Sequence, residues 1–169
     1  MTTSGRPGAP DETGDAYAVI AFREQGRWQV GQLPDAVTDD LDALIAAVRQ
    51  QPGENGAFAL VDVADEFFVV VRVQLGRVRL LLSDVTAATD WDLADQVLEH
   101  LDLDTPDDDE DEVEPAGDLR VFADLGLDER ELSVLLSDND AYADEMLGAL
   151  TARLGFGGEY QRVVDALVG

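Results

Sequence analysis

The chain contains no cysteine, no lysine and a single histidine, His100, among its 169 residues. Without cysteine it cannot provide a thiolate nucleophile, a cysteine-type zinc site or the ligands of an iron–sulfur cluster. Without lysine it cannot form a Schiff base or supply the lysine of a phosphate-binding loop. One imidazole alone makes no zinc site, so we interpret His100 as a residue near the C-terminal end of a helix. The sequence therefore names no catalytic residue, and no metal or other cofactor is expected.

Long hydrophobic runs and a secretory signal are also missing. The longest uninterrupted apolar run spans residues 16–22, far short of the about 20 residues that cross a bilayer. The first fifteen residues carry three acids and no apolar segment typical of a secretory leader. We therefore expect a cytoplasmic protein that makes no contact with membranes.

Positive charge is scarce. The chain has 37 Asp and Glu residues against 11 Arg, a net charge of −26 at pH 7. Such a chain is repelled by the phosphate backbone of nucleic acids, so we expect no direct nucleic-acid binding. Hydrophobic residues still make up 46% of the chain, which is enough for a globular core.

The negative charge is densest in residues 102–118, which carry ten acids and no base. Six consecutive acids lie between Pro106 and Pro115, namely Asp107, Asp108, Asp109, Glu110, Asp111 and Glu112. A block of like charges repels itself and stays extended, so we predict a linker at 102–118, with contact to a basic partner as the alternative. A calcium loop needs alternating carboxylates and a Gly at its turn, and this run has neither. Residues 1–14 predict a disordered tail, because they are rich in Gly, Pro, Ser and Thr.

Residues 15–101, between the tail and the linker, alternate between strand and helix patterns. Apolar, β-branched runs predict five strands, at residues 16–23, 27–33, 57–63, 67–74 and 77–84. Most of the loops are too short for parallel crossovers. Apolar stripes with helical spacing predict a helix that begins after Thr38, Asp39 or Asp40 as cap and a second helix from about Asp90. The prediction is an α+β domain of order ββαβββα, in which two helices pack on a mostly antiparallel, five-stranded sheet.

After the linker, residues 119–169 show only helical spacing. One apolar stripe follows Asp128, which is the predicted cap of its helix. A second apolar stripe ends at Gly155, and a third begins at Tyr160. Three short helices are marginal alone, so we expect a small all-helical subdomain that packs on itself or docks on the sheet. The glycine-rich residues 155–158 predict a helix cap and a turn, because no strand precedes them as in a phosphate-binding loop.

Three arginines within eight residues form the sharpest candidate site. If the turn between their two strands has two residues, Gln74 opposes Arg77 and Arg72 opposes Arg79, so all three guanidinium groups share one face of the sheet. A bulge at Gly76 would shift this register and separate them. The cluster of Arg72, Arg77 and Arg79 predicts a site for an anion or for the carboxylates of a partner. The alternative is that these arginines pair with acids elsewhere in the chain.

Several segments resemble a known protein family. They are Ala-Tyr-Ala-Val-Ile-Ala-Phe-Arg-Glu at 16–24 followed by Gly26-Arg27-Trp28, Phe-Ala-Asp-Leu-Gly-Leu at 122–127, and Asp-Glu-Met-Leu at 144–147 with Arg-Leu-Gly-Phe at 153–156. Over residues 15–168 the chain resembles the actinobacterial tRNA adenosine deaminase-associated proteins. That family name reflects gene neighbourhood with a tRNA adenosine deaminase, and the resemblance transfers no catalytic or binding residue.

The chemistry of the deaminase itself is excluded for this chain. A zinc deaminase holds its metal with His-x-Glu and Pro-Cys-x-x-Cys segments, whereas here His100 is followed by Leu101 and Asp102, and there is no cysteine. We expect a non-enzymatic acidic accessory protein that binds a basic protein, with the deaminase as the partner that the resemblance implies. Two alternatives remain, a homo-oligomeric scaffold joined through edge strands and a small hydrolase with paired carboxylates in a cleft.

Overall fold

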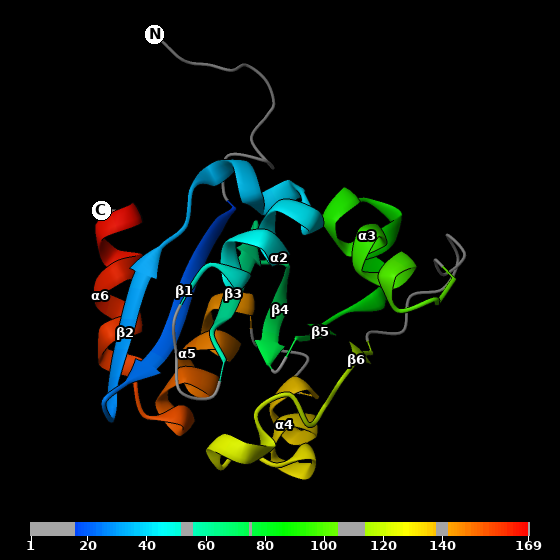
Figure 1. Cartoon of the computed structure of the whole chain (residues 1–169). Coiled ribbons are helices and arrows are strands. Elements are labelled where there is room, and N and C mark those ends of the chain that lie inside the picture. Colours follow the sequence, from blue (N-terminus) through cyan, green and yellow to red (C-terminus); the bar gives the residue numbers. More distant parts are fainter. Residues whose placement is uncertain (1–15, 52–55, 75, 105–113, 138–141, 169) are drawn as a thin grey trace, which may run out of the picture.

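The protein folds around one six-stranded sheet. The computed structural model describes residues 16–51, 56–74, 76–104, 114–137 and 142–168 (Figure 1), so the predicted tail at 1–14 and the acidic run at 107–112 lie outside the described residues. The strands are β1 (Tyr17–Glu24), β2 (Arg27–Gln32), β3 (Phe58–Val63), β4 (Phe67–Gln74), β5 (Arg77–Leu82) and β6 (Ala116–Gly117). Their order is β2-β1-β3-β4-β5-β6, and each neighbouring pair is antiparallel. The α+β class is confirmed.

The prediction of five strands was wrong by one. The sixth strand, β6, consists of two residues that pair with Leu81 and Leu82 of β5. Two residues are too few to show a period, so the sequence pattern could not reveal this strand. Gly117 fits there because its φ is +110° and because a Cβ would lie 2.2 Å from the carbonyl oxygen of Leu80. The segment predicted as a linker therefore ends within the sheet.

One face of the sheet is covered by α2 (Leu41–Arg49) and α3 (Asp92–His100), with the short 3-10 helices η1 (Asp35–Asp39) and η2 (Val85–Thr89) beside them. Figure 1 shows α2 in front of the strands. Of the three predicted caps of α2, Asp40 is the one whose side chain accepts a hydrogen bond, from the N–H of Ala43 at 3.2 Å. The apolar stripe of α2 is buried against the sheet, as its spacing predicted.

The opposite face is covered by α4 (Glu129–Leu136), α5 (Ala143–Leu154) and α6 (Gly157–Val168), together with the short η3 (Ala123–Leu125). Asp128 caps α4 and Gly155 ends α5 with a φ of +105°, both as the sequence indicated. The aromatic rings of Phe58, Phe122, Phe156 and Trp28 meet on this side, with centroids 4.4 to 5.8 Å apart. The C-terminal helices thus dock on the sheet and share a hydrophobic core with it.

Candidate functional site

The three candidate arginines share one face of the sheet, and this face is the one under the C-terminal layer. Strands β4 and β5 pair Arg72 with Arg79 and Gln74 with Arg77, which is the register of a two-residue turn. The competing bulge at Gly76 does not occur. Alternation along β4 places Arg72 beside Val70, which belongs to the core under α4, α5 and α6.

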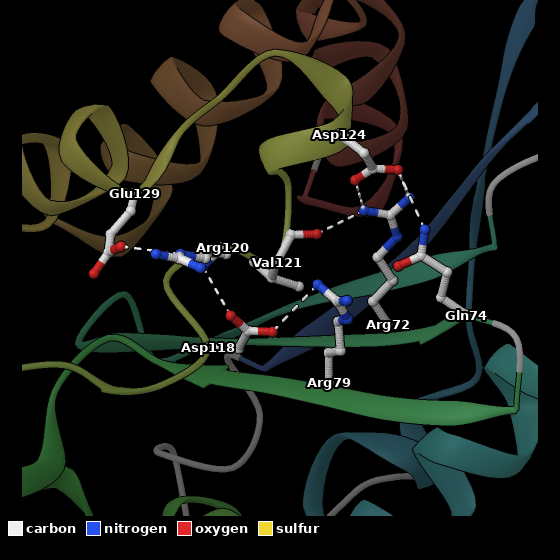
Figure 2. Close-up of polar contacts among 8 residues, drawn as sticks. All are labelled: Arg72, Gln74, Arg79, Asp118, Arg120, Val121, Asp124 and Glu129. Carbon is white, nitrogen blue, oxygen red and sulfur yellow. Dashed lines mark hydrogen bonds and ion pairs between the residues drawn. The ribbon is translucent and has the colours of Figure 1, made fainter.

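Arg72 is fully buried and is paired within the chain (Figure 2). Its guanidinium group donates to both carboxylate oxygens of Asp124, at 2.7 and 3.0 Å, and to the carbonyl oxygen of Val121 at 2.6 Å. The side chain of Arg72 has no exposed surface, whereas that of Asp124 is 40% exposed. Burial alone would raise the pKa of Asp124, but the hydrogen bonds and charge of Arg72 outweigh it, so that this pKa is lowered. In this structure Arg72 is therefore closed to a partner's carboxylate.

The segment that leads from β6 to η3 also supplies a carboxylate, that of Asp118, for the second arginine, Arg79. Asp118 lies 3.4 Å from Arg79, and both side chains are about one-third exposed or less. Gln74 donates to Asp124 at 3.2 Å, which adds a further link between β4 and η3 (Figure 2). The two opposed guanidinium groups are thus balanced by Asp118 and Asp124. Arg77 is exposed at the beginning of β5 and remains accessible to an anion or a partner.

A shallow hollow lies beside Arg72. It is lined by Arg23, Trp28, Gly56, Phe58, Arg72 and Leu125. The guanidinium group of Arg23 lies over the indole ring of Trp28, 5.6 Å from its centroid, a distance at which the ring attracts a cation. The hollow is open to solvent and encloses no space the size of a water molecule, so it offers no binding cavity for a small substrate.

The layer of α2 and α3 carries more net negative charge than the opposite layer. Residues 36–51 and 84–104 of this layer contain ten acids and one arginine, a net of −9, whereas 114–137 and 142–168 in the opposite layer contain ten acids and four arginines, a net of −6. Eight of the acids around α2 and α3 are exposed, namely Asp39, Asp40, Asp42, Asp90, Asp92, Glu99, Asp102 and Asp104. This acidic surface is the strongest candidate contact on the described part of the chain.

Gln96 of α3 holds the two halves of the acidic surface together. Its side-chain oxygen accepts a hydrogen bond from the backbone N–H of Leu41 at 2.8 Å, and its amide donates to the carbonyl oxygen of Asp39 at 3.0 Å. The N-terminal end of α2 is thereby fixed to the middle of α3. The carboxylates of both helices consequently act as one surface instead of two independent patches.

A buried polar cluster exists that the sequence interpretation did not single out. Asp62 of β3 is 2% exposed, and its carboxylate accepts hydrogen bonds from the hydroxyl of Tyr17 at 3.2 Å and from the N–H of Asp65 at 2.9 Å. The hydroxyl of Tyr17 also lies 3.0 Å from that of Tyr160 in α6. Asp62 interrupts an otherwise apolar strand at an alternating position that faces the core, and that interruption was the signal in the sequence.

The remaining candidates are placed as follows. His100 is the exposed last residue of α3. Within the described ranges, no three His, Cys, Asp or Glu side chains are arranged to hold a metal ion. None of the helices that the structure describes is long and apolar enough to cross a membrane.

Comparison with known proteins gives the family. Residues 16–157 match the family model of the Rv3753c-like tRNA adenosine deaminase-associated protein. The chain is also similar to Protein Rv3753c of Mycobacterium tuberculosis (strain ATCC 25618 / H37Rv), with 40% identity over 164 residues, which is 96% of this chain and 94% of that protein. No solved structure matches the chain. On the family match and this identity over nearly its whole length, the chain belongs to the Rv3753c-like tRNA adenosine deaminase-associated protein family.

Proposed function

We propose that this chain is a non-enzymatic accessory protein that binds a basic protein through the acidic surface of α2 and α3, and that the partner is a tRNA adenosine deaminase. The family description supports the choice of partner. The observation that carries the proposal is the net charge of −9 in this layer, with eight exposed carboxylates and a single arginine, Arg49. An enzyme that handles RNA needs a basic surface, and such a surface complements this one.

Electrostatics predicts how such a complex behaves. Complementary charge speeds the encounter of two proteins and fixes their orientation more than it adds affinity. Exposed charges are screened over about 8 Å at physiological ionic strength. The association therefore weakens as the salt concentration rises. A partner whose affinity stayed unchanged at high salt would not be bound through this surface.

Two observations support a role without catalysis. The sequence has no thiol and no amine side chain for covalent chemistry. Asp62, whose carboxyl has the most altered environment among the described acids, is 2% exposed, and its neighbour Tyr160 is also 2% exposed. A substrate would have no path to this carboxyl in the structure, which argues against a hydrolase that uses Asp62 as one of two carboxylates in a cleft.

The proposal is tested by measuring the dissociation constant with purified tRNA adenosine deaminase from the same organism at several salt concentrations. The triple variant Asp90→Asn, Asp92→Asn, Glu99→Gln removes three charges from the acidic surface, and it should weaken binding at low salt at least tenfold. The matched control Glu129→Gln, Glu159→Gln, Asp165→Asn removes three charges from the opposite layer, two exposed and that of Glu159 partly exposed, and should change binding less than twofold. Absence of binding at every salt concentration, or equal losses for both variants, contradicts the proposal.

The acidic run at 107–112 is tested in a separate arm, because it lies outside the described residues. A variant with Asn or Gln at all six positions distinguishes a contact made by this run from one made by the surface of α2 and α3. If only this variant loses binding, the partner contact belongs to the run and the assignment to α2 and α3 is wrong.

A further inference from the structure

The cluster around Asp62 joins four elements of the fold. Asp62 of β3 accepts from Tyr17 of β1, and Tyr17 in turn contacts Tyr160 of α6. The second oxygen of Asp62 accepts from the N–H of Asp65 in the turn between β3 and β4. One buried carboxyl is thus connected to both the sheet and the last helix.

The turn between β3 and β4 carries this connection on to α5. The backbone oxygen of Asp65 accepts from the N–H of Ala143 at 3.2 Å, and its carboxylate accepts from the N–H of Asp144 at 2.8 Å. Both central residues of the turn, Ala64 and Asp65, have positive φ angles, of 54° and 60°, which residues other than glycine seldom adopt. The hydrogen bond from Asp65 to Asp62 holds the turn in this conformation. The N-terminus of α5 therefore depends on the position of Asp62.

The charged and titratable groups that face Asp62 are acids and phenols. They are Tyr17 on β1, Asp65 in the turn, Asp144 on α5 and Tyr160 on α6, and Glu145 lies next to Asp65. Each hydrogen bond to the Asp62 carboxylate comes from a neutral donor. Burial raises the pKa of Asp62 to about 7, and the negative charges of Asp65 and Asp144 contribute, against the lowering effect of the hydrogen bonds.

We propose that the Asp62 carboxyl is a proton-controlled latch between the sheet and the C-terminal helices α5 and α6. When it is protonated, the neutral group satisfies the hydroxyl of Tyr17 and the turn that anchors α5. When it is ionised, a buried charge faces Asp65 and Asp144 without a cation in hydrogen-bond contact, and water reaches it only if α5 and α6 move away from the sheet. The two helices consequently open more often as the pH rises.

Hydrogen exchange of the backbone amides tests this latch on the full chain. Each pH unit between the ordinary pKa of an Asp carboxyl and the raised one changes the closed-to-open ratio about tenfold. Between pH 5 and pH 8 the protection of α5 and α6, corrected for the intrinsic exchange rate, should fall by roughly ten- to a hundredfold. The protection of α2, on the other face of the sheet, should fall much less.

The isosteric variant Asp62→Asn isolates the carboxyl. It keeps an oxygen for the N–H of Asp65 and cannot ionise, so the protection of α5 and α6 should become nearly independent of pH. The control Asp42→Asn, which removes an exposed charge from α2, should keep the pH dependence of the unmodified chain. The proposal is overturned if the protection of α2 falls as much as that of α5, or if the protection of α5 and α6 in Asp62→Asn falls with pH as it does in the unmodified chain.

A second measurement needs no substitution. Carbon-13 NMR of the Asp carboxyl groups gives the titration midpoint of Asp62 directly, and the amide resonances of α5 and α6 should shift with the same midpoint, near pH 7. A midpoint near 4, or a midpoint near 7 without any change in α5 and α6, refutes the proposal even if Asp62→Asn does not fold.

Discussion

Replacement of Asp124 by alanine leaves the Arg72 guanidinium group buried without its carboxylate. Breaking a fully buried ion pair from one side costs about 3–5 kcal/mol, because the remaining charge is uncompensated. The side chain of Asp124 is 40% exposed, so water can enter the space that it leaves. The backbone oxygen of Val121 also remains as an acceptor. We therefore expect Asp124→Ala to lower the free energy of unfolding by about 2–3 kcal/mol, less than for a fully buried pair.

Removal of the cation is expected to be milder. Arg72→Met keeps most of the side-chain volume, removes the buried charge and leaves the half-exposed carboxylate of Asp124 to be hydrated. The backbone oxygen of Val121 loses its partner, which costs about 1–2 kcal/mol. The double variant Arg72→Met, Asp124→Ala contains neither charge, so its stability should equal that of Arg72→Met alone. The resulting coupling energy of the pair equals the loss expected for Asp124→Ala, about 2–3 kcal/mol.

Urea unfolding followed by tryptophan fluorescence measures this cycle, because Trp28 lies on the same face and contacts Phe156. The exposed pair of Arg120 and Glu129, with side chains 75% and 52% exposed, is a matched control with an expected coupling below about 0.5 kcal/mol. The reasoning is refuted if Asp124→Ala is no more harmful than Arg72→Met, or if both pairs give the same coupling.

Three further outcomes are expected. Arg72 lowers the pKa of Asp124 although burial would raise it. The stability that comes from this pair is therefore present above about pH 4 and is lost as the pH falls. In urea titrations between pH 2 and 6, Asp124→Asn should reduce this loss of stability at acidic pH. Gly117→Ala should destabilise the chain more than Gly126→Ala in thermal melts, because both residues have a positive φ but, of the two, only at Gly117 would a Cβ clash with backbone atoms. Equal losses of stability would show that strand β6 shifts to make room for the Cβ. Phe156→Ala removes a fully buried ring from the aromatic cluster and should cost about 3–5 kcal/mol in urea unfolding; a loss under 1 kcal/mol would mean that the α5–α6 junction is not packed on the sheet.

Local periodicity was sufficient for the first five strands, for the helices α2 to α6 and for one register. Next to their turn, strands β4 and β5 alternate between apolar and polar residues, and the pairing that puts Val71 opposite Leu80 also puts Arg72 opposite Arg79, as the structure shows. What covers this face could not be read in the same way. Asp124 reaches Arg72 from 52 positions further along the chain, and no spacing rule links a strand residue to a loop so distant. The role of Asp62 was missed for the same reason, since its partners Tyr17 and Tyr160 are 45 and 98 positions away.

The helical layers on the two faces of the sheet are connected to the strands differently, and their cores differ accordingly. Helices α2 and α3 are tied to the strands by short connections, and the core beneath them is apolar. The C-terminal layer follows a long acidic segment, so its position must be selected by contacts. The described buried polar side chains are Asp62, Arg72, Ser83 and Thr151, and the first two bond directly to residues of the C-terminal layer or its anchoring turn.

Apolar contact is non-directional, whereas a buried guanidinium group requires a carboxylate at one place. We therefore infer that the main effect of Arg72 is to select a single arrangement of the C-terminal layer, beyond its contribution of about 1–2 kcal/mol to stability. The double variant Arg72→Met, Asp124→Ala tests this separately from its stability, because its amide resonances in α5 and α6 should broaden or double while those of α2 stay sharp. A single sharp set throughout the chain would show that apolar packing alone determines how these helices dock.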